Sequence, residues 1–307
     1  MLVKDPPVEI ADGLWMLGAN AYPVYLLRGE KEAAMVEGGI GPIGLLVREQ
    51  LQTLSVDPAT VKTLILAHAH PDHVMAVPAF REMFPDVTVT ASAAAAKTLK
   101  IDKAIAFFCK MDGALTDALI ETGQMEEKYR PEPVEITEIA VDRSVKQGDR
   151  IELDGFAFEV LETPGHSDCS LSLYEPDRKI LFISDATGYY MPKHECWWPN
   201  YFVDYGTYVD SMQRLAALDT EILCLGHHAA ITGADAVQAY FRDVIAATES
   251  LHQEIVEEVG TGKTVREVAE RLGTDVHEKL PLFPLDFYQK NCGLLVKASL
   301  RHEGIEV

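Results

Sequence analysis

Residues 61–73 read Val61-Lys-Thr-Leu-Ile-Leu-Ala67-His68-Ala-His70-Pro-Asp72-His73. The first seven form an apolar run with β-branched residues, which predicts a buried strand. Three imidazoles and a carboxylate follow where this strand ends. In extended backbone His68 and His70 lie on one face and can chelate one ion, whereas the turn at Pro71 directs Asp72 and His73 towards a second. This stretch therefore predicts a metal site at the end of a strand.

Further metal-ligand residues follow other predicted strands. The strand ending at Glu162 leads into Thr163-Pro-Gly-His166, the strand 180–184 is followed by Asp185, and the strand ending at Leu225 is followed by Gly226-His227. Side chains at the carboxyl ends of these strands are expected to meet at one rim. Imidazole and carboxylate ligands suit zinc, iron or manganese, and the absence of a cysteine ligand leaves the metal open.

Strands and helices alternate over roughly the first 230 residues, and helices alone are expected afterwards. Short strands are predicted at 14–18, 22–28, 31–37 and 87–91, and hairpins at 150–153/156–162 and 171–174/179–184. Residues from about 92 to 133 have helical spacing and form a helical insert. Capping boxes at 232–235 and 264–267 open a helix to about Val259 and a short helix ending at Gly273, and a last helix ends near Gly304.

Composition excludes several classes of function. The chain has 48 acidic and 27 basic residues and a formal net charge of −21, so neither nucleic acid nor an anionic membrane surface is an expected partner. It has no run of 18 apolar residues, no secretory leader is evident, and its five cysteines show no paired spacing. We therefore expect a cytoplasmic protein with free thiols that acts on a small molecule.

The order His-x-His-x-Asp-His, then His, Asp and His, resembles the metallo-β-lactamase fold superfamily. The resemblance implies an α/β fold, a four-layer αββα sandwich over residues 1–230, with helices 231–307 packing over the active site. It also implies a site for two divalent ions, zinc or iron with manganese as a further alternative. Asp72 would orient a metal-bound hydroxide or take its proton. The implied ligands are His68, His70 and His166 on one ion, Asp72, His73 and His227 on the other, and Asp185 bridging.

Flanking segments narrow the resemblance to one branch. Tyr22-Pro-Val-Tyr-Leu-Leu-Arg28, Met35-Val-Glu-Gly-Gly39 and Gly165-His166-Ser167-Asp168 look like the quinolone-signal response protein and its thioesterase-like, glyoxalase II-like relatives. The basic residues that glyoxalase II uses for glutathione are not recognisable. In this group the C-terminal helices enclose an apolar acyl pocket. The resemblance implies that the pocket is lined by Tyr189, Tyr190, Trp197, Phe283, Leu285 and Tyr288, although such aromatic residues are also typical of a core.

The functional hypothesis is a dinuclear hydrolase whose metal-bound hydroxide attacks an ester-like carbonyl, with a thioester of a hydrophobic acyl group as the first candidate substrate. A phosphodiesterase using the same metal pair, a regulatory or ligand-sensing protein that keeps the site, and a mononuclear iron oxygenase are the alternatives. A homodimer through the N-terminal strands or the helical tail is a further open expectation. The stretch Glu37-Gly-Gly-Ile-Gly41 is interpreted as a turn after a strand, because no Lys-Ser/Thr pair follows it.

Overall fold

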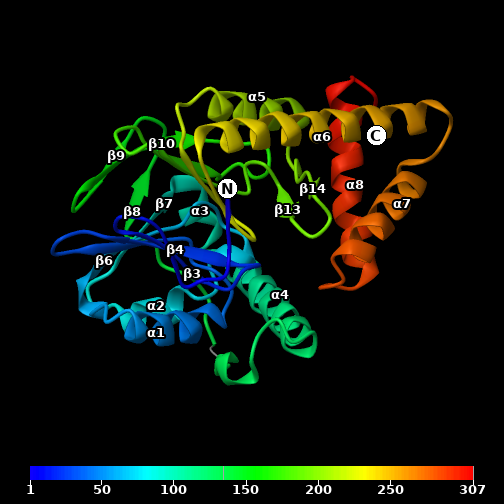
Figure 1. Cartoon of the computed structure of the whole chain (residues 1–307). Helices are drawn as coiled ribbons and strands as arrows, with labels where there is room; N and C mark the ends of the chain where they lie inside the picture. Colours follow the sequence, from blue (N-terminus) through cyan, green and yellow to red (C-terminus); the bar gives the residue numbers. More distant parts are fainter. Residues whose placement is uncertain (134, 307) are drawn as a thin grey trace. The chain divides into compact units, whose positions relative to one another are not determined.

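Two seven-stranded sheets are the main elements of the fold, and the first is formed by the N-terminal half of the chain (Figure 1). Its first four strands form an antiparallel meander, and the last four run parallel through crossover connections. The strands are, in spatial order, β2 (Val8–Ala11), β3 (Leu14–Gly18), β4 (Pro23–Arg28), β5 (Ala33–Val36), β6 (Val61–Ile65), β7 (Thr88–Ser92) and β8 (Arg143–Val145).

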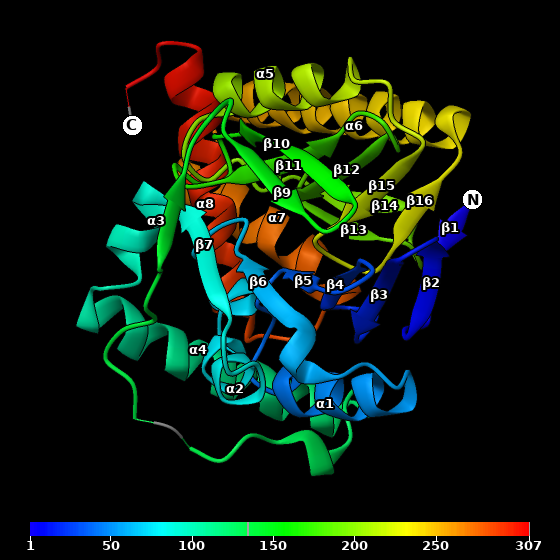
Figure 2. The ribbon, with the colours of Figure 1, turned by 90° about the vertical axis from the view of Figure 1, so that its left-hand side faces the viewer.

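The second sheet is antiparallel except where β12 pairs with β15 (Figure 2). Because β12 and β15 run parallel, their carboxyl ends lie at the same edge of the sheet, and Ser184 pairs with Leu225 there. In spatial order the strands are β1 (Leu2–Val3), β16 (Ala230–Thr232), β15 (Ile222–Leu225), β12 (Ile180–Ser184), β11 (Leu171–Glu175), β10 (Phe156–Glu162) and β9 (Arg150–Leu153).

The two sheets share one hydrophobic core. Along β10 the buried Phe156, Phe158 and Val160 alternate with more exposed neighbours, as expected of a strand that packs on one face. Tyr25 of β4 meets Phe182 of β12 edge to face, with ring centroids 5.2 Å apart. This packing joins the N-terminal meander to the later hairpins.

The structure, a computed structural model, describes residues 1–133 and 135–306, and it divides into two compact units. Unit 1 contains both sheets and comprises Met1–Glu162, Cys169–Ser184 and Asp219–Ala234. Figures 1 and 2 show α1 and α2 next to each other along the first sheet. The helices of unit 1 are α1 (Ile43–Thr53), α2 (Val77–Met83), α3 (Ala93–Thr98) and α4 (Asp102–Glu121), with short 3-10 turns η1 (Pro58–Thr60), η2 (Pro71–His73) and η3 (Glu127–Tyr129).

Helix α4 carries a carboxylate on its buried face. Its apolar side chains Ile105, Phe108, Leu115 and Leu119 are buried at helical spacing, and Asp112 lies among them with 7% of its surface exposed. Burial raises the pKa of the Asp112 carboxyl to about 6; the Gly41 amide opposes this rise and the charge of Asp72 adds to it.

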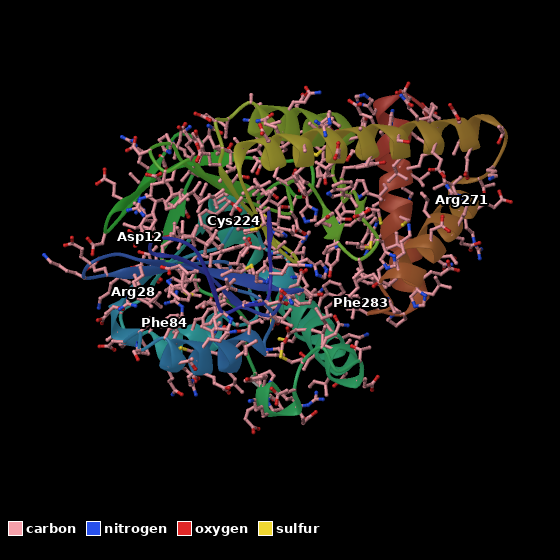
Figure 3. The ribbon with its side chains drawn as sticks, in the orientation of Figure 1. Asp12, Arg28, Phe84, Cys224, Arg271 and Phe283 are labelled. Atoms are coloured by element: carbon pink, nitrogen blue, oxygen red, sulfur yellow. The ribbon has the colours of Figure 1, made fainter. Side chains whose placement is uncertain are left out.

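Unit 2 comprises Thr163–Asp168, Asp185–Leu218 and Asp235–Val307. Helices α6 and α7 are joined by Arg271, which lies 2.6 Å from Glu254 and 2.9 Å from Glu258 (Figure 3). The expected capping box of Thr264 and Glu267 opens α7. The elements are the ribbon β13 (Tyr189–Met191) and β14 (Cys196–Trp198) with α5 (Tyr205–Ala216), α6 (Ala234–Gly260), α7 (Val265–Lys279) and α8 (Leu285–His302). Among the described helices of the whole chain, none has the length and apolarity needed to cross a membrane.

Three expectations were wrong. The capping box at 232–235 does not form, because Thr232 is the last residue of β16 and α6 begins at Ala234. The strand ending at Leu225 is not the last strand, because the three-residue β16 pairs with β15. Gly273 does not end α7, which continues to Lys279. A Cβ atom at Gly273 would lie 2.5 Å from the backbone nitrogen of Gln289 in α8. The glycine therefore allows α7 and α8 to approach closely instead of stopping a helix.

We expect Gly273→Ala to destabilise the protein by about 1–3 kcal/mol, because the added methyl group overpacks the contact between α7 and α8. Gly293→Ala is the matched control in α8: its nearest neighbour would be the Ala269 Cβ at 3.8 Å, and its higher helix propensity should leave stability unchanged or raised by up to about 1 kcal/mol. Urea unfolding measures both. Equal stability of the two variants would contradict the assigned role of Gly273.

The pH dependence of stability should change in Asp112→Asn. A carboxyl whose pKa is raised on folding stabilises the folded state below its unfolded value of 3.8, and this contribution is lost as the pH rises through about 6. The difference between these values corresponds to about 3 kcal/mol. In metal-free protein we expect the variant to gain stability relative to wild type between pH 4 and pH 8 by up to about that amount. Unfolding curves with a pH-independent difference would contradict this prediction.

Candidate metal centre

The histidine-rich segment after β6 is held by backbone contacts within unit 1. The amide of Leu171 donates to the Ala67 carbonyl at 2.8 Å, and the amide of Ala69 donates to the Cys169 sulfur at 3.3 Å. His68 and His73 are buried, whereas His70 and Asp72 are partly exposed. The turn predicted at Pro71 is the 3-10 turn η2. The segment thus presents four donor side chains from a fixed backbone.

Asp72, His73 and His227 come together in unit 1. The Asp72 Oδ2 atom lies 3.6 Å from the Nε2 atom of His73 and 3.6 Å from the Nε2 atom of His227. Their ligand atoms all lie within 4.8 Å of one another. Two ligands of one tetrahedral zinc ion are about 3.3 Å apart, from bond lengths of about 2.0–2.1 Å. The observed spacing is too long for hydrogen bonds and close to that of ligands sharing an ion.

The His68 ring joins this group to His70. Its centroid lies 4.2 Å from that of His73 and 4.6 Å from that of His70. His73 and His227 have centroids 5.2 Å apart. Unit 1 therefore brings together all five of the predicted ligands that it contains.

Hydrogen bonds on the outer side fix three of these rings. The Nδ1 atom of His227 donates to the Ala21 carbonyl at 2.8 Å, which leaves the lone pair of Nε2 available to a metal ion. The Nδ1 atom of His73 lies 3.1 Å from the Glu37 carboxylate, and that of His68 lies 3.2 Å from the Ser184 hydroxyl. Such outer partners orient ligands and raise their basicity.

Left-handed backbone at non-glycine residues marks the same region. Glu37 has a φ of +76°, Ser184 of +46° and His228 of +67°. Such conformations are costly outside glycine and persist where surrounding contacts enforce them, often at functional sites. Glu37 and Ser184 contact histidines that are predicted ligands, and His228 follows another.

Unit 2 contains the other two predicted ligands and brings them together. The Nε2 atom of His166 lies 3.5 Å from Asp185 Oδ2, and both side chains are buried. His166 is fixed through Nδ1, which lies 2.9 Å from the Asn200 carbonyl. Gly165 precedes it with a φ of +121°, and a Cβ there would lie 2.4 Å from Tyr208. Asp185 directly follows Ser184, the last residue of β12.

Four of the six predicted substrate-contacting residues lie in two aromatic groups of unit 2. Tyr190 and Trp197, on the β13–β14 ribbon, have ring centroids 5.2 Å apart, and each lies 5.8 Å from Tyr240 of α6. Tyr288 lies 5.4 Å from Trp198 and 6.4 Å from Phe283. Tyr288 is fully buried and donates a hydrogen bond to the Leu280 carbonyl, Tyr189 is buried, and Leu285 is exposed.

Several positioning groups were not identified from the sequence. Glu37 belongs to the segment interpreted as a turn, and Ser184 is the last residue of a predicted strand. A carboxylate directly after a fully buried strand, beside two glycines, was the available signal for Glu37. Ala21 and Asn200 contact histidines through backbone carbonyl groups, which every residue has, so the sequence cannot identify them.

The donor set fits a divalent ion. Neutral imidazole and carboxylate oxygen are the ligands that zinc, iron and manganese accept, and the outer hydrogen bond of His227 selects the tautomer that a metal requires. A cation would also offset the Asp72 charge, which faces two buried imidazoles.

Comparisons with known proteins agree with this geometry. Residues 17–227 match the sequence model of the metallo-beta-lactamase superfamily. A metallo-beta-lactamase family protein from Thermus thermophilus has a similar structure, with a TM-score of 0.65, 22% identity, and coverage of 96% of this chain and 95% of that one. A subclass B3 metallo-beta-lactamase of Bradyrhizobium japonicum gives a TM-score of 0.59 and 15% identity, over 85% of this chain and 97% of that one.

Similarity to curated relatives is confined to a short segment. Hydroxyacylglutathione hydrolases of Brucella ovis and Brucella abortus are 41% identical over 46 residues, which is 15% of this chain. The match spans 18% of the length of those relatives.

The family match covers more than half of the chain and contains the predicted ligands in the order expected from the sequence. The paired sheets, the flanking helices and the C-terminal helices confirm the predicted fold class. The chain belongs to the metallo-beta-lactamase superfamily of metal-dependent hydrolases.

Proposed function

We propose that this protein is a dinuclear metal-dependent hydrolase that cleaves thioesters of hydrophobic acyl groups. One observation carries the proposal. The side chains of Asp72, His73 and His227 converge, with two imidazole nitrogens 3.6 Å from one carboxylate oxygen. We assign these three residues to one ion and His68, His70 and His166 to the other. Asp185, beside His166, is proposed as the ligand that both ions share.

Bound ions would polarise the substrate carbonyl and lower the pKa of a water molecule. Asp72 is suited to handle the proton, because its side chain is 26% exposed while those of His73 and His227 are 2% exposed. A water molecule can therefore reach the Asp72 carboxylate, which orients it and accepts its proton. The buried histidines, fixed through Nδ1, keep the donor atoms in place during the reaction.

Two observations support an apolar thioester as the substrate. The relatives with a short match are named hydroxyacylglutathione hydrolase, and an acylated glutathione is a thioester. Tyr190, Trp197 and Tyr240 form an aromatic group on the β13–β14 ribbon and α6, and we propose that this group binds the acyl chain. The net charge of −21 disfavours a polyanionic substrate.

A panel of substrates tests the proposal. Protein loaded with zinc, iron or manganese is assayed on short-chain and long-chain acyl thioesters, a lactone and bis(4-nitrophenyl) phosphate. We expect the highest kcat/KM on the long-chain thioester. Asp185→Asn should lower both metal content and turnover, the latter by more than about 100-fold, while Asp210→Asn on the exposed side of α5 changes neither.

Three other outcomes would contradict parts of the proposal. Hydrolysis of the phosphodiester alone would assign a phosphodiesterase instead. Two bound ions without turnover on any substrate would favour a ligand-sensing role. Unchanged metal content in Asp185→Asn would contradict the ligand assignment.

The Glu37 carboxylate should strengthen metal binding through His73. We expect Glu37→Ala to weaken binding of the ion assigned to His73 by about 10–100-fold, because the ring loses its outer partner. Glu37→Gln keeps an acceptor oxygen and should lose less. Chelator competition with zinc measures the affinity, with Glu32→Ala as an exposed control. Affinity within twofold of wild type in Glu37→Ala would refute this role.

A further inference from the structure

We propose that Asp112 of helix α4 is a positioning residue for the metal ligand His73, acting through the Gly41 amide and the loop 37–41. The inference rests on the proposed function, because it assigns a role towards the same metal site. It gives the helix between β7 and β8 a part in metal binding.

Loop 37–41 holds the ligand turn at several points. Glu37 contacts the Nδ1 atom of His73 at 3.1 Å, and the Gly38 amide donates to the His73 carbonyl at 2.9 Å. The Met75 amide donates to the Gly39 carbonyl at 2.8 Å. The loop therefore fixes both the side chain and the backbone of one ligand, so a displacement of the loop displaces His73.

Loop 37–41 packs directly against the backbone of the turn that contains His73. A Cβ atom at Gly38 would lie 2.6 Å from the His73 carbonyl oxygen, and Gly39 has a φ of +53°. Both positions favour glycine for steric reasons. The spacing of loop and ligand turn is consequently set by backbone contact, which transmits small movements directly.

Asp112 holds the other end of this loop. Its Oδ1 atom accepts a hydrogen bond from the Gly41 amide at 2.8 Å, across 71 residues of sequence. A Cβ atom at Gly41 would lie 2.6 Å from Asp112 Oδ2. Helix α4 also packs against η2, the turn that contains Asp72 and His73. Helix α4 thus contacts both the loop and the turn that carries His73, and the Asp112 carboxylate makes its hydrogen bond to the loop.

The burial of Asp112 argues for a role beyond packing. Its neighbours on the buried face of α4, Phe108 and Leu115, are apolar. A buried carboxylate is costly, and an apolar residue of similar volume is often at least as stabilising at such a position. The hydrogen bond to Gly41 gives the acid a specific task, namely to fix the loop that holds His73.

Metal affinity separates this role from a purely structural one. Zinc affinity is measured by chelator competition, and the site geometry by the visible spectrum of cobalt-loaded protein, in wild type, Asp112→Ala, Asp112→Asn and Thr116→Val. Thr116 is the matched control, since it is a buried polar residue one turn further along α4. We expect Asp112→Ala to weaken the affinity by about 10-fold and to alter the cobalt spectrum. Asp112→Asn, which keeps an acceptor for Gly41, should restore both, and Thr116→Val should resemble wild type.

A double-mutant cycle keeps the proposal testable if Asp112→Ala folds poorly. Gly41→Ala should also weaken the affinity, because its methyl group displaces the carboxylate, and the double variant should be no weaker than Asp112→Ala. Strictly additive losses of zinc affinity in the double variant would overturn the proposal. Equal losses of affinity in Asp112→Asn and Asp112→Ala would also overturn it, because they would show that the charge of Asp112 and not its hydrogen bond to Gly41 matters. Wild-type affinity in Asp112→Ala would overturn this inference alone, whereas wild-type protein that binds none of zinc, iron and manganese would overturn the proposed function as well.

Discussion

Histidines that bind metals are almost always oriented by a hydrogen bond at the second ring nitrogen, and contacts at Nδ1 provide this for three buried histidines of unit 1. Their partners are Glu37, Ser184 and the Ala21 carbonyl. Glu37 follows β5, Ser184 ends β12 and Ala21 precedes β4. The two sheets thus supply the groups that orient the ligands, and this explains why the core that joins Tyr25 to Phe182 matters for the site.

This arrangement has a local conformational cost. Glu37 and Ser184 adopt positive φ values that place their side chains against histidines, and His228 adopts one beside His227. Each such conformation costs of the order of 1–3 kcal/mol, which the well-packed sheets around it offset. The chain carries a strong net negative charge of −21, and a cation held by the proposed ligands would concentrate positive charge at one place. An oxyanion formed in the proposed hydrolysis would be stabilised there.

Elements with a strong local pattern could be predicted from the sequence. The bounds of β3, β9 and β10 agree with the prediction because apolar alternation and the Asp154-Gly155 turn are local signals. Helix α1 was not predicted, since it has Gly44 in its first turn and no side-chain cap. Gly273 was misinterpreted as a helix end because the group that requires a glycine there, the backbone of Gln289, lies in α8. Strand β16 was missed because its three residues are too few to show an alternation of apolar and polar side chains.

The same division holds for the candidate site. The five predicted ligands of unit 1 follow strand ends, so residue type and spacing were enough to predict that these side chains lie close together. Ser184 is separated from His68 by 116 residues and Glu37 from His73 by 36, and no local pattern connects such pairs. The hydrogen bond between Asp112 and Gly41 could not be predicted either. A helical pattern indicates which residues are buried, but it does not indicate which backbone amide a buried side chain contacts.

The most direct measurement is the number and position of bound ions, from elemental analysis and anomalous diffraction of crystals of the loaded protein. We predict two ions per chain, one of them contacting Asp72, His73 and His227 and the other contacting His68 and His70. A single ion, or ions bound by other residues, would contradict this prediction.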